Sequence, residues 1–406
     1  MLISIIIIFY IQLYRILQII IVSVSSIAIC FKKKIYRKFI MQNQKSVLID
    51  ENIPFLCEIL SQKFNVVKFS GRDLDNHKLK NSNCFALFVR STTKVNSELL
   101  TGTSVQFVAT ATSGSDHIDK EYLSKSNIIF ADALGSNSNS VAEYVIYSIL
   151  HAFQIRQEQV RGRTIGIIGF GNIGSKLAYY SNKLGLKILV NDPPLRDSEF
   201  QFPHYCEYCE LDDLMENSDI ISNHVPLTTD TKYPTIDLLN WSQLCNMKPD
   251  VLFVHSSRGK IVNEADLVEF IAQNPYTQTV IDVFDNEPLI NTYLAEHSII
   301  STPHIAGYSR NGKLNGVIMV LDKFEKFIKE KFDRDIIEKE FKLSSFRGEF
   351  VTEDFIYQKI DEYRKISVDS DTFSEIFELD DKEKETQFDL QRKEYPIRFE
   401  YLNINN

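Results

Sequence analysis

Arg163-Thr-Ile-Gly-Ile-Ile-Gly169-Phe-Gly171-Asn172-Ile173-Gly174 is the stretch of this 406-residue chain that decides its fold. A short apolar run leads into a G-x-G-x-x-G pattern, a helix is predicted over Ser175–Leu184, and the next apolar run ends at Asp192. This strand–loop–helix–strand order, closed by an acid, is typical of a dinucleotide-binding unit. The stretch therefore predicts a Rossmann domain rather than an ordinary glycine-rich turn.

The residues of this stretch have separate predicted tasks. Gly169 permits the tight turn, Gly171 lets the backbone approach a pyrophosphate, and Gly174 lets the helix pack closely on its strand. Asn172–Ile173 lead into the helix N-terminus, whose free N–H groups favour phosphate. Asp192 can accept hydrogen bonds from a free ribose 2′-hydroxyl and repel a 2′-phosphate, so the predicted cofactor is NAD rather than NADP.

Outward from this stretch, apolar runs alternate with amphipathic segments, which predicts parallel sheets covered by helices. The first series of predicted strands is Val47–Ile49, Val66–Phe69, Phe85–Val89, Phe107–Ala109 and Ile128–Phe130. The second series is Thr164–Gly169, Lys187–Val190, Ile220–Ser222, Val251–His255 and Thr279–Val283. Both series fit doubly wound α/β domains, so the predicted class is α/β with two such sheets.

The order of the segments predicts that the second series is inserted into the first. Apolar-periodic helices over Val141–Gln157 and Leu314–Lys331 would be the two crossings. We therefore predict a flavodoxin-like substrate domain (41–140 and 303–334), an inserted Rossmann NAD domain (141–302) and a small C-terminal α+β domain (335–406). The last segment is densely charged, but its many aromatic residues favour a folded structure.

Residues 1–40 differ in composition from the rest of the chain. Leu2–Cys30 is mostly apolar, Lys32–Lys38 is basic, and the segment has no acidic residue. Read literally, it is a membrane anchor with a basic cytoplasmic flank. We favour the other interpretation, that Met41 begins a cytoplasmic enzyme, because a buried-strand pattern follows it almost at once. A membrane association is thus expected only if residues 1–40 are translated.

Composition excludes several classes of protein. The formal net charge is −9 and no basic stripe with interleaved aromatics occurs, so we do not expect nucleic-acid binding. The six cysteines are scattered, which favours a reducing compartment over a disulfide framework. Cys206 and Cys209 form a C-x-x-C, but a zinc knuckle needs a second such set of ligands, and we predict no metal site.

Three residues downstream of the glycine-rich stretch fit the oxidation of a secondary alcohol. Such a reaction needs a base for the hydroxyl proton, a group that orients this base, and a cation for the substrate carboxylate. His304, Glu287 and Arg258 are the candidates for these roles, in that order. Each lies at or just after the end of an apolar run, and open α/β sheets bind ligands at that edge.

The segments around these residues resemble the D-isomer-specific 2-hydroxyacid dehydrogenase family. The segments are His255-Ser-Ser-Arg258-Gly259, Asp282-Val-Phe-Asp-Asn-Glu287-Pro288 and Thr302-Pro-His304-Ile-Ala-Gly307-Tyr308. The resemblance implies that Arg258 binds the carboxylate, that Glu287 raises the basicity of His304, and that His304 is the general base. It also implies that Asp282, Val225 and Gly307 contribute to the NAD site.

Further stretches resemble one branch of this family, which acts on a small phosphorylated 2-hydroxy acid and forms homodimers. They are Asp50–Pro54, Val89–Asn96, Ala109–Asp119, Asp192–Pro194 and Phe388–Glu400. The resemblance implies substrate contacts by Ser91, Thr112 and Tyr308. Because phosphate requires cations, Arg90 is a candidate for its recognition, as is Arg72.

Two alternatives remain open at this point. The first is a related dehydrogenase that acts on 3-phosphoglycerate or on an unphosphorylated 2-hydroxy acid. The second is a non-catalytic NAD-sensing protein on the same scaffold. The set formed by Arg258, Glu287 and His304 speaks against the second alternative.

Overall fold

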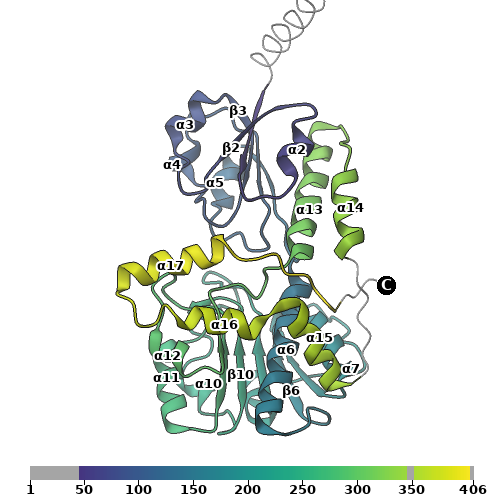
Figure 1. Ribbon diagram of the computed structural model, residues 1–406, viewed down its shortest axis with the longest axis vertical. Coiled ribbons are helices and arrows are strands. Elements are labelled where there is room, and N and C mark those ends of the chain that lie inside the picture. The colour runs from purple at the N-terminus through teal and green to yellow at the C-terminus, as the bar shows by residue number, and fades with distance from the viewer. Residues whose placement is uncertain (1–44, 345–351, 403–406) are drawn as a thin grey trace, which may run out of the picture. The chain divides into compact units, whose positions relative to one another are not determined.

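The computed structural model describes residues 45–344 and 352–402, which contain two parallel sheets (Figure 1). The described residues divide into two units. The first unit holds those up to Ala109 together with Asp116–Ala131, and the second holds Thr110–Ser115 and those from Asp132 onward. The segment 303–334, which we predicted to belong with 41–140, is grouped with the second unit.

The first unit is a five-stranded sheet in the order β2-β1-β3-β4-β5. This is the flavodoxin-like order, in which the chain reverses direction across the sheet between β1 and β3. Strands β1, β3 and β4 are buried along their whole length, which explains their unbroken apolar sequence. The strands are β1 (Ser46–Asp50), β2 (Asn65–Phe69), β3 (Cys84–Val89), β4 (Phe107–Thr110) and β5 (Ile129–Ala131); the helices are α2 (Leu56–Leu60), α3 (Asn76–Asn81), α4 (Ser97–Leu100) and α5 (Lys120–Lys125).

The second unit holds a seven-stranded sheet in the order β12-β11-β10-β9-β6-β7-β8. Every strand pairs in parallel with its neighbours, and the direction of winding reverses between β6 and β9. Five of these strands were predicted; β8 and β12 were not, because three and two residues are too short for a periodic signal. The strands are β6 (Thr164–Ile168), β7 (Lys187–Asn191), β8 (Cys206–Tyr208), β9 (Ile220–Asn223), β10 (Leu252–His255), β11 (Gln278–Ile281) and β12 (Ile300–Ser301).

Helices cover this sheet and fix its core. Tyr144, Tyr147 and Phe153 of α6 are almost completely buried, so this helix lies inside the unit rather than on its surface. Helix α13 begins at a cap in which the Ser309 hydroxyl accepts the Gly312 N–H at 2.9 Å. The elements are α6 (Ser138–Arg156), α7 (Gly174–Lys183), α8 (Pro193–Asp197), α9 (Leu211–Asn217), α10 (Trp241–Leu244), the 3-10 helix Gly259–Ile261, α11 (Glu264–Gln273), α12 (Thr292–Glu296) and α13 (Arg310–Ile328).

The C-terminal segment contains four helices and, among its described residues, no strand. The α+β prediction for this part was therefore wrong for those residues. Its apolar side chains recur at helical spacing, as the buried Ile356 and Ile360 show. The helices are α14 (Asp335–Ser344), α15 (Glu353–Arg364), α16 (Ile366–Ser374) and α17 (Asp381–Lys393).

A buried ion pair joins this C-terminal segment to α6. Arg364 and Glu143 are both fully buried, and Nη1 of Arg364 lies 3.2 Å from Oε1 of Glu143. The other oxygen of Glu143 accepts the backbone N–H groups of Tyr401 (2.7 Å) and Leu402. Burial raises the pKa of Glu143 to about 7, although Arg364 opposes that rise. Arg364 also donates to the carbonyl oxygen of Ala306 at 3.0 Å, within the loop that carries His304.

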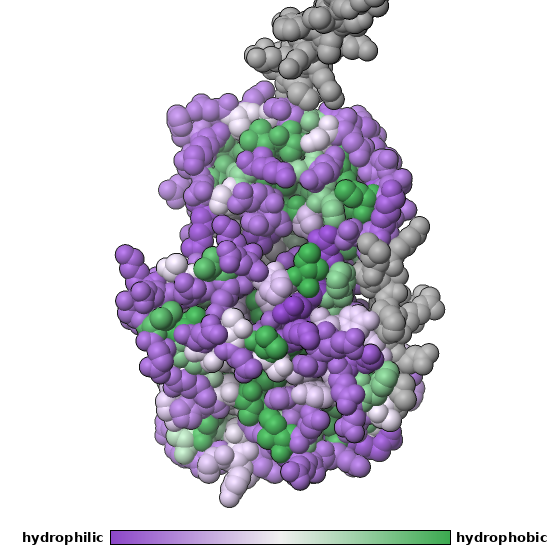
Figure 2. All heavy atoms as spheres, in the orientation of Figure 1, coloured by the Kyte–Doolittle hydropathy of each residue, from purple (hydrophilic) through white to green (hydrophobic). Residues whose placement is uncertain are grey.

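Hydrophilic side chains dominate the face seen in Figure 2, and hydrophobic ones form separate small groups between them. Within the part of the chain that the structure describes, no helix is both long enough and apolar enough to cross a bilayer. The anchor interpretation of residues 1–40 lies outside the described residues.

Candidate active site

Three neighbouring strands bring the predicted catalytic residues to one edge of the second sheet. Strands β10, β11 and β12 pair side by side in parallel, so their carboxyl ends lie along the same edge. Arg258 follows β10, Glu287 follows β11 and His304 follows β12. This placement explains how residues far apart in the sequence reach one site.

His304 and Glu287 are in direct contact. Nδ1 of His304 lies 2.8 Å from Oε2 and 3.1 Å from Oε1 of Glu287. If Nδ1 donates to this carboxylate, Nε2 is left to accept a proton, as a general base requires. The side chains are 29% and 19% exposed, so the imidazole stays within reach of a substrate.

The charge of Glu287 suits this role. Burial alone would raise the pKa of the carboxyl, but His304, Arg392 and the backbone N–H of Phe284 outweigh it and hold the pKa below its ordinary value. The Phe284 N–H donates to Oε1 at 3.0 Å. Glu287 is therefore ionised at neutral pH and stabilises a positive charge on His304.

Asp282 holds the loop that carries His304. Its Oδ1 accepts the hydroxyl of Thr302 at 2.6 Å and the N–H of Ile305 at 2.7 Å, and its Oδ2 accepts the N–H of Ala306 at 3.0 Å. His304 lies between these donors in the left-handed backbone region, with φ 56°. The contact of Asp282 with the nicotinamide stays a prediction. Its positioning of the loop was missed, because the sequence gives no signal for backbone partners.

Asp282 should give the folded protein a distinct pH dependence. Burial raises the pKa of this carboxyl from 3.8 to about 6, although its hydrogen bonds oppose the rise. The folded state then holds the proton more tightly than the unfolded state. Its contribution to the free energy of unfolding is largest below about pH 4 and falls by about 3 kcal/mol between pH 4 and pH 6.

We therefore expect Asp282→Asn to remove this decline. Urea unfolding of the wild type and the variant, measured at intervals from pH 4 to pH 7, gives the difference in unfolding free energy at each pH. That difference should shift in favour of the variant as the pH rises. A difference that stays constant across the interval would show that Asp282 keeps its ordinary pKa.

Arg258 is positioned by the close approach of two loops. Its Nη1 donates to the carbonyl oxygen of Ser257 at 2.8 Å. A Cβ at the next residue, Gly259, would lie 2.1 Å from the carbonyl oxygen of Phe284, in the loop that leads to Glu287. Only glycine fits there, so Gly259 lets the loops after β10 and β11 pack against each other.

The glycine-rich loop lies where the winding of the sheet reverses, after β6 and beside the end of β9. Gly169 has φ +88°, and a Cβ on it would lie 2.9 Å from Val225 after β9. A Cβ on Gly174, which begins α7, would lie 2.1 Å from the Gly169 carbonyl oxygen. A Cβ on Gly171 would meet nothing within 4 Å. Open space at Gly171 is what the approach of a pyrophosphate requires.

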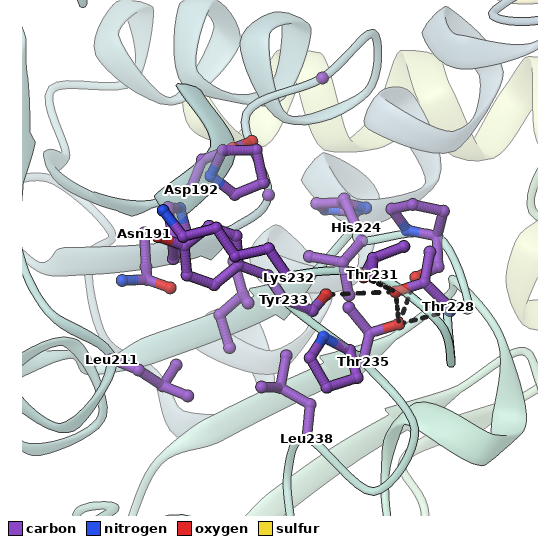
Figure 3. A pocket seen from close by; sticks show the side chains of 18 of the residues that line it. Asn191, Asp192, Leu211, His224, Thr228, Thr231, Lys232, Tyr233, Thr235 and Leu238 are labelled. Carbon is purple, nitrogen blue, oxygen red and sulfur yellow. Dashed lines mark hydrogen bonds between the residues drawn. The ribbon is translucent and has the colours of Figure 1, made fainter. Parts of the chain in front are cut away.

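A cavity of about 670 Å³ adjoins this loop and includes Gly169, Gly171, Asp192 and Val225 in its lining. Figure 3 shows Leu211 and Leu238 on the side of the cavity opposite Asp192. Asp192 accepts the N–H of Phe170 at 2.8 Å and caps α8 through Leu195, so it joins the glycine-rich loop to the end of β7. The loop, the acid and the cavity together fit the adenosine half of NAD.

The lysine that lines this cavity, and an arginine of the neighbouring helix α8, already have acidic partners. Nζ of Lys232 lies 2.5 Å from Asp197, and Arg196 contacts Asp197 at 3.1 Å and Glu210 at 2.8 Å. Burial lowers the pKa of His224, which also lines the cavity, to about 3, so this ring is neutral. No cation is thus held ready here for a 2′-phosphate among the described lining residues.

The remaining predicted residues have varied places. Ser91 is exposed just after β3, and Arg90 donates through Nε to the buried Asp50 at 3.1 Å; both belong to the first unit. Thr112 belongs to the second unit and contacts Thr110 at 2.8 Å. Tyr308 follows His304 in the same loop. Two of the remaining predicted cofactor residues are closely packed: a Cβ on Gly135 would lie 2.8 Å from Asn172, and a Cβ on Gly307 would lie 2.1 Å from Nδ2 of Asn137. Ile173 directly precedes α7.

Comparison with known proteins gives the same class. The family profile described as D-isomer specific 2-hydroxyacid dehydrogenase, NAD binding domain, matches residues 143–306. Erythronate-4-phosphate dehydrogenase of Acinetobacter baumannii is 34% identical over 87% of this chain and 97% of its own. The enzyme of the same name from Escherichia coli is 36% identical over 70% of this chain and 73% of its own. Among solved structures, D-lactate dehydrogenase from Aquifex aeolicus with NAD and lactic acid gives a TM-score of 0.59 at 23% identity, covering 70% of this chain and 96% of that one.

The fold and the site thus define an NAD-dependent oxidoreductase of the D-isomer-specific 2-hydroxyacid dehydrogenase class. Within this class, the chain belongs to the erythronate-4-phosphate dehydrogenase family.

Proposed function

We propose that this protein oxidises 4-phospho-D-erythronate at C2 to 2-oxo-3-hydroxy-4-phosphobutanoate. The observation that carries the proposal is the contact between His304 and Glu287, 2.8 Å, at the sheet edge that also presents Arg258. The names of the relatives supply the substrate, since this chain spans nearly the whole length of one of them. The reaction would serve the synthesis of pyridoxal 5′-phosphate.

Each residue has a defined part in this reaction. Arg258 binds the substrate carboxylate through its planar guanidinium. Nε2 of His304 accepts the C2 hydroxyl proton while the C2–O bond becomes a carbonyl. Glu287 stabilises the imidazolium that forms. When bound, NAD supplies the acceptor for the C2 hydride.

The proposal also assigns tasks to the segments of the chain. Residues 41–140 with 303–334 would bind substrate, through Ser91, Thr112, Tyr308 and Arg90, and residues 141–302 would bind NAD. Residues 335–406 would form a homodimer, which sedimentation of the full chain measures. Four exposed apolar side chains in the described part of that segment support it: Ile336, Phe355, Val368 and Ile397. The free cysteines are consistent with a cytoplasmic enzyme, and fractionation of cells tests this against membrane anchoring.

Turnover with three acids tests the substrate. We expect the full chain to form NADH with 4-phospho-D-erythronate at a kcat/KM at least about 100 times that with 3-phosphoglycerate or D-lactate, because binding a phosphate at the right distance from C2 lowers the barrier. Absorbance of NADH gives the rates. Preference for another acid would move the protein to a related dehydrogenase activity. No turnover with any acid, despite NAD binding, would favour the sensing protein.

A further inference from the structure

Two cations from different helices lie beside the ring of Tyr308. Nζ of Lys313, in α13, is 5.2 Å from the ring centroid, and Cζ of Arg392, in α17, is 5.9 Å from it. Tyr308 is four residues after His304, in the loop that Asp282 holds. The two cations therefore belong to the surroundings of the candidate catalytic pair, although nothing in the sequence assigned either of them a role.

Arg392 forms no ion pair with a carboxylate among the described residues. Its guanidinium packs on Phe388 at 5.5 Å, and Nε is buried with no hydrogen-bond partner among the described residues. Burial disfavours its charge, but Tyr308 and Glu287 raise its pKa above the ordinary value. Glu287 is already engaged by His304 and the Phe284 N–H, so it does not neutralise Arg392 at close range.

Four other arginines with little exposure differ from Arg392 in this respect. Arg364 is paired with Glu143, Arg310 with Glu340 and Arg398 with Asp369, at 2.7–3.2 Å. Arg90, the earlier candidate for phosphate, is paired with the buried Asp50 at 3.1 Å. No such ion pair joins Arg392 to a carboxylate in the described part of the chain. A half-buried guanidinium without a carboxylate partner has charge and donors to offer a ligand.

We propose that Arg392 and Lys313 form the subsite that binds the phosphate of the substrate. This inference rests on the proposed function for its substrate, and it names the residues that distinguish a phosphorylated from an unphosphorylated acid. A four-carbon substrate has a carboxylate at C1 and a phosphate at C4, so it requires cations at both ends. Arg258 serves the first end, and Arg392 with Lys313, both beside the Tyr308 ring, serves the second.

The test compares substrates that differ only in the phosphate. Arg392→Gln should lower kcat/KM for 4-phospho-D-erythronate by about 100-fold more than kcat/KM for D-erythronate, mainly through KM. Arg392→Lys should recover part of the loss, and Lys313→Gln should act in the same direction. Lys393→Gln, at the exposed next position of α17, is the matched control and should behave as wild type. Equal loss on both substrates would overturn the proposal and leave Arg392 as a support for Tyr308.

A binding measurement separates this inference from the proposed function. Inorganic phosphate, titrated calorimetrically into the NAD-bound full chain, should bind the wild type and Lys393→Gln, and bind Arg392→Gln at least ten times more weakly. That result would support the subsite even if 4-phospho-D-erythronate proved not to be the substrate. Equal phosphate binding by wild type and Arg392→Gln, or none by wild type, would overturn it.

Discussion

Replacing His304 by asparagine is expected to lower kcat by a factor of about 10² to 10⁴, which is the usual contribution of a positioned general base. Asparagine suits this position because it tolerates the left-handed conformation that His304 adopts at φ 56°, whereas alanine adds backbone strain. The amide cannot accept the hydroxyl proton at neutral pH. The rate of NADH formation at saturating substrate and NAD measures the effect.

Binding of NAD provides the control for this variant. The glycine-rich loop and the cavity beside it are built from other strand ends than the loop that carries His304. The dissociation constant for NAD, measured by fluorescence titration, should therefore change less than about three-fold. A fall in kcat of less than ten-fold, with NAD binding intact, would remove His304 from the role of base.

Replacing Gly259 by alanine is expected to produce the second large effect. The added Cβ would lie 2.1 Å from the Phe284 carbonyl oxygen and 2.5 Å from the Asp285 nitrogen, and backbone atoms cannot rotate away. The loops after β10 and β11 must separate, which should lower the free energy of unfolding by about 1–3 kcal/mol. Because Arg258 and Glu287 are carried by these loops, kcat/KM should fall by about 100-fold.

Gly162 offers the matched control. It has φ +83°, but a Cβ there would meet nothing within 4 Å, so Gly162→Ala should cost about 1 kcal/mol in backbone strain and leave kcat/KM unchanged. Denaturant unfolding and steady-state kinetics give both quantities for each variant. Wild-type kcat/KM in Gly259→Ala would contradict the idea that this close approach positions Arg258.

Much of the fold could be predicted from sequence because most of its strands are short, largely apolar runs separated by amphipathic helices. Both series of strands were found, and their parallel pairing follows from the helices between them. The two-residue β12 was missed, although it is the strand that leads to His304. The C-terminal helices were mistaken in part for strands, because dense charge obscures the helical spacing of apolar residues such as Ile356 and Ile360.

The candidate site could likewise be predicted from the sequence only in part. His304 and Glu287 could be proposed from chemistry and resemblance, and the structure brings them into contact. The backbone partners of Asp282 and the cations beside Tyr308 could not be predicted from the sequence, because such contacts depend on how loops and helices pack in space. Arg392 lies 88 residues after His304, in the stretch Phe388–Glu400, whose resemblance to the family assigned no role to any single residue.

The hydrogen bonds from the backbone N–H groups of Tyr401 and Leu402 to Glu143 have a consequence during protein synthesis, because they form between early and late parts of the chain. Ribosomes make the N-terminal part of a chain first, and completed domains fold as they emerge. The glycine-rich loop can form while synthesis continues. The support that Arg364 gives to Ala306, and the hydrogen bonds that hold Tyr401, become available only after these later residues have left the ribosome. A nascent chain can thus form its nucleotide-binding loop long before its catalytic loop is fully supported.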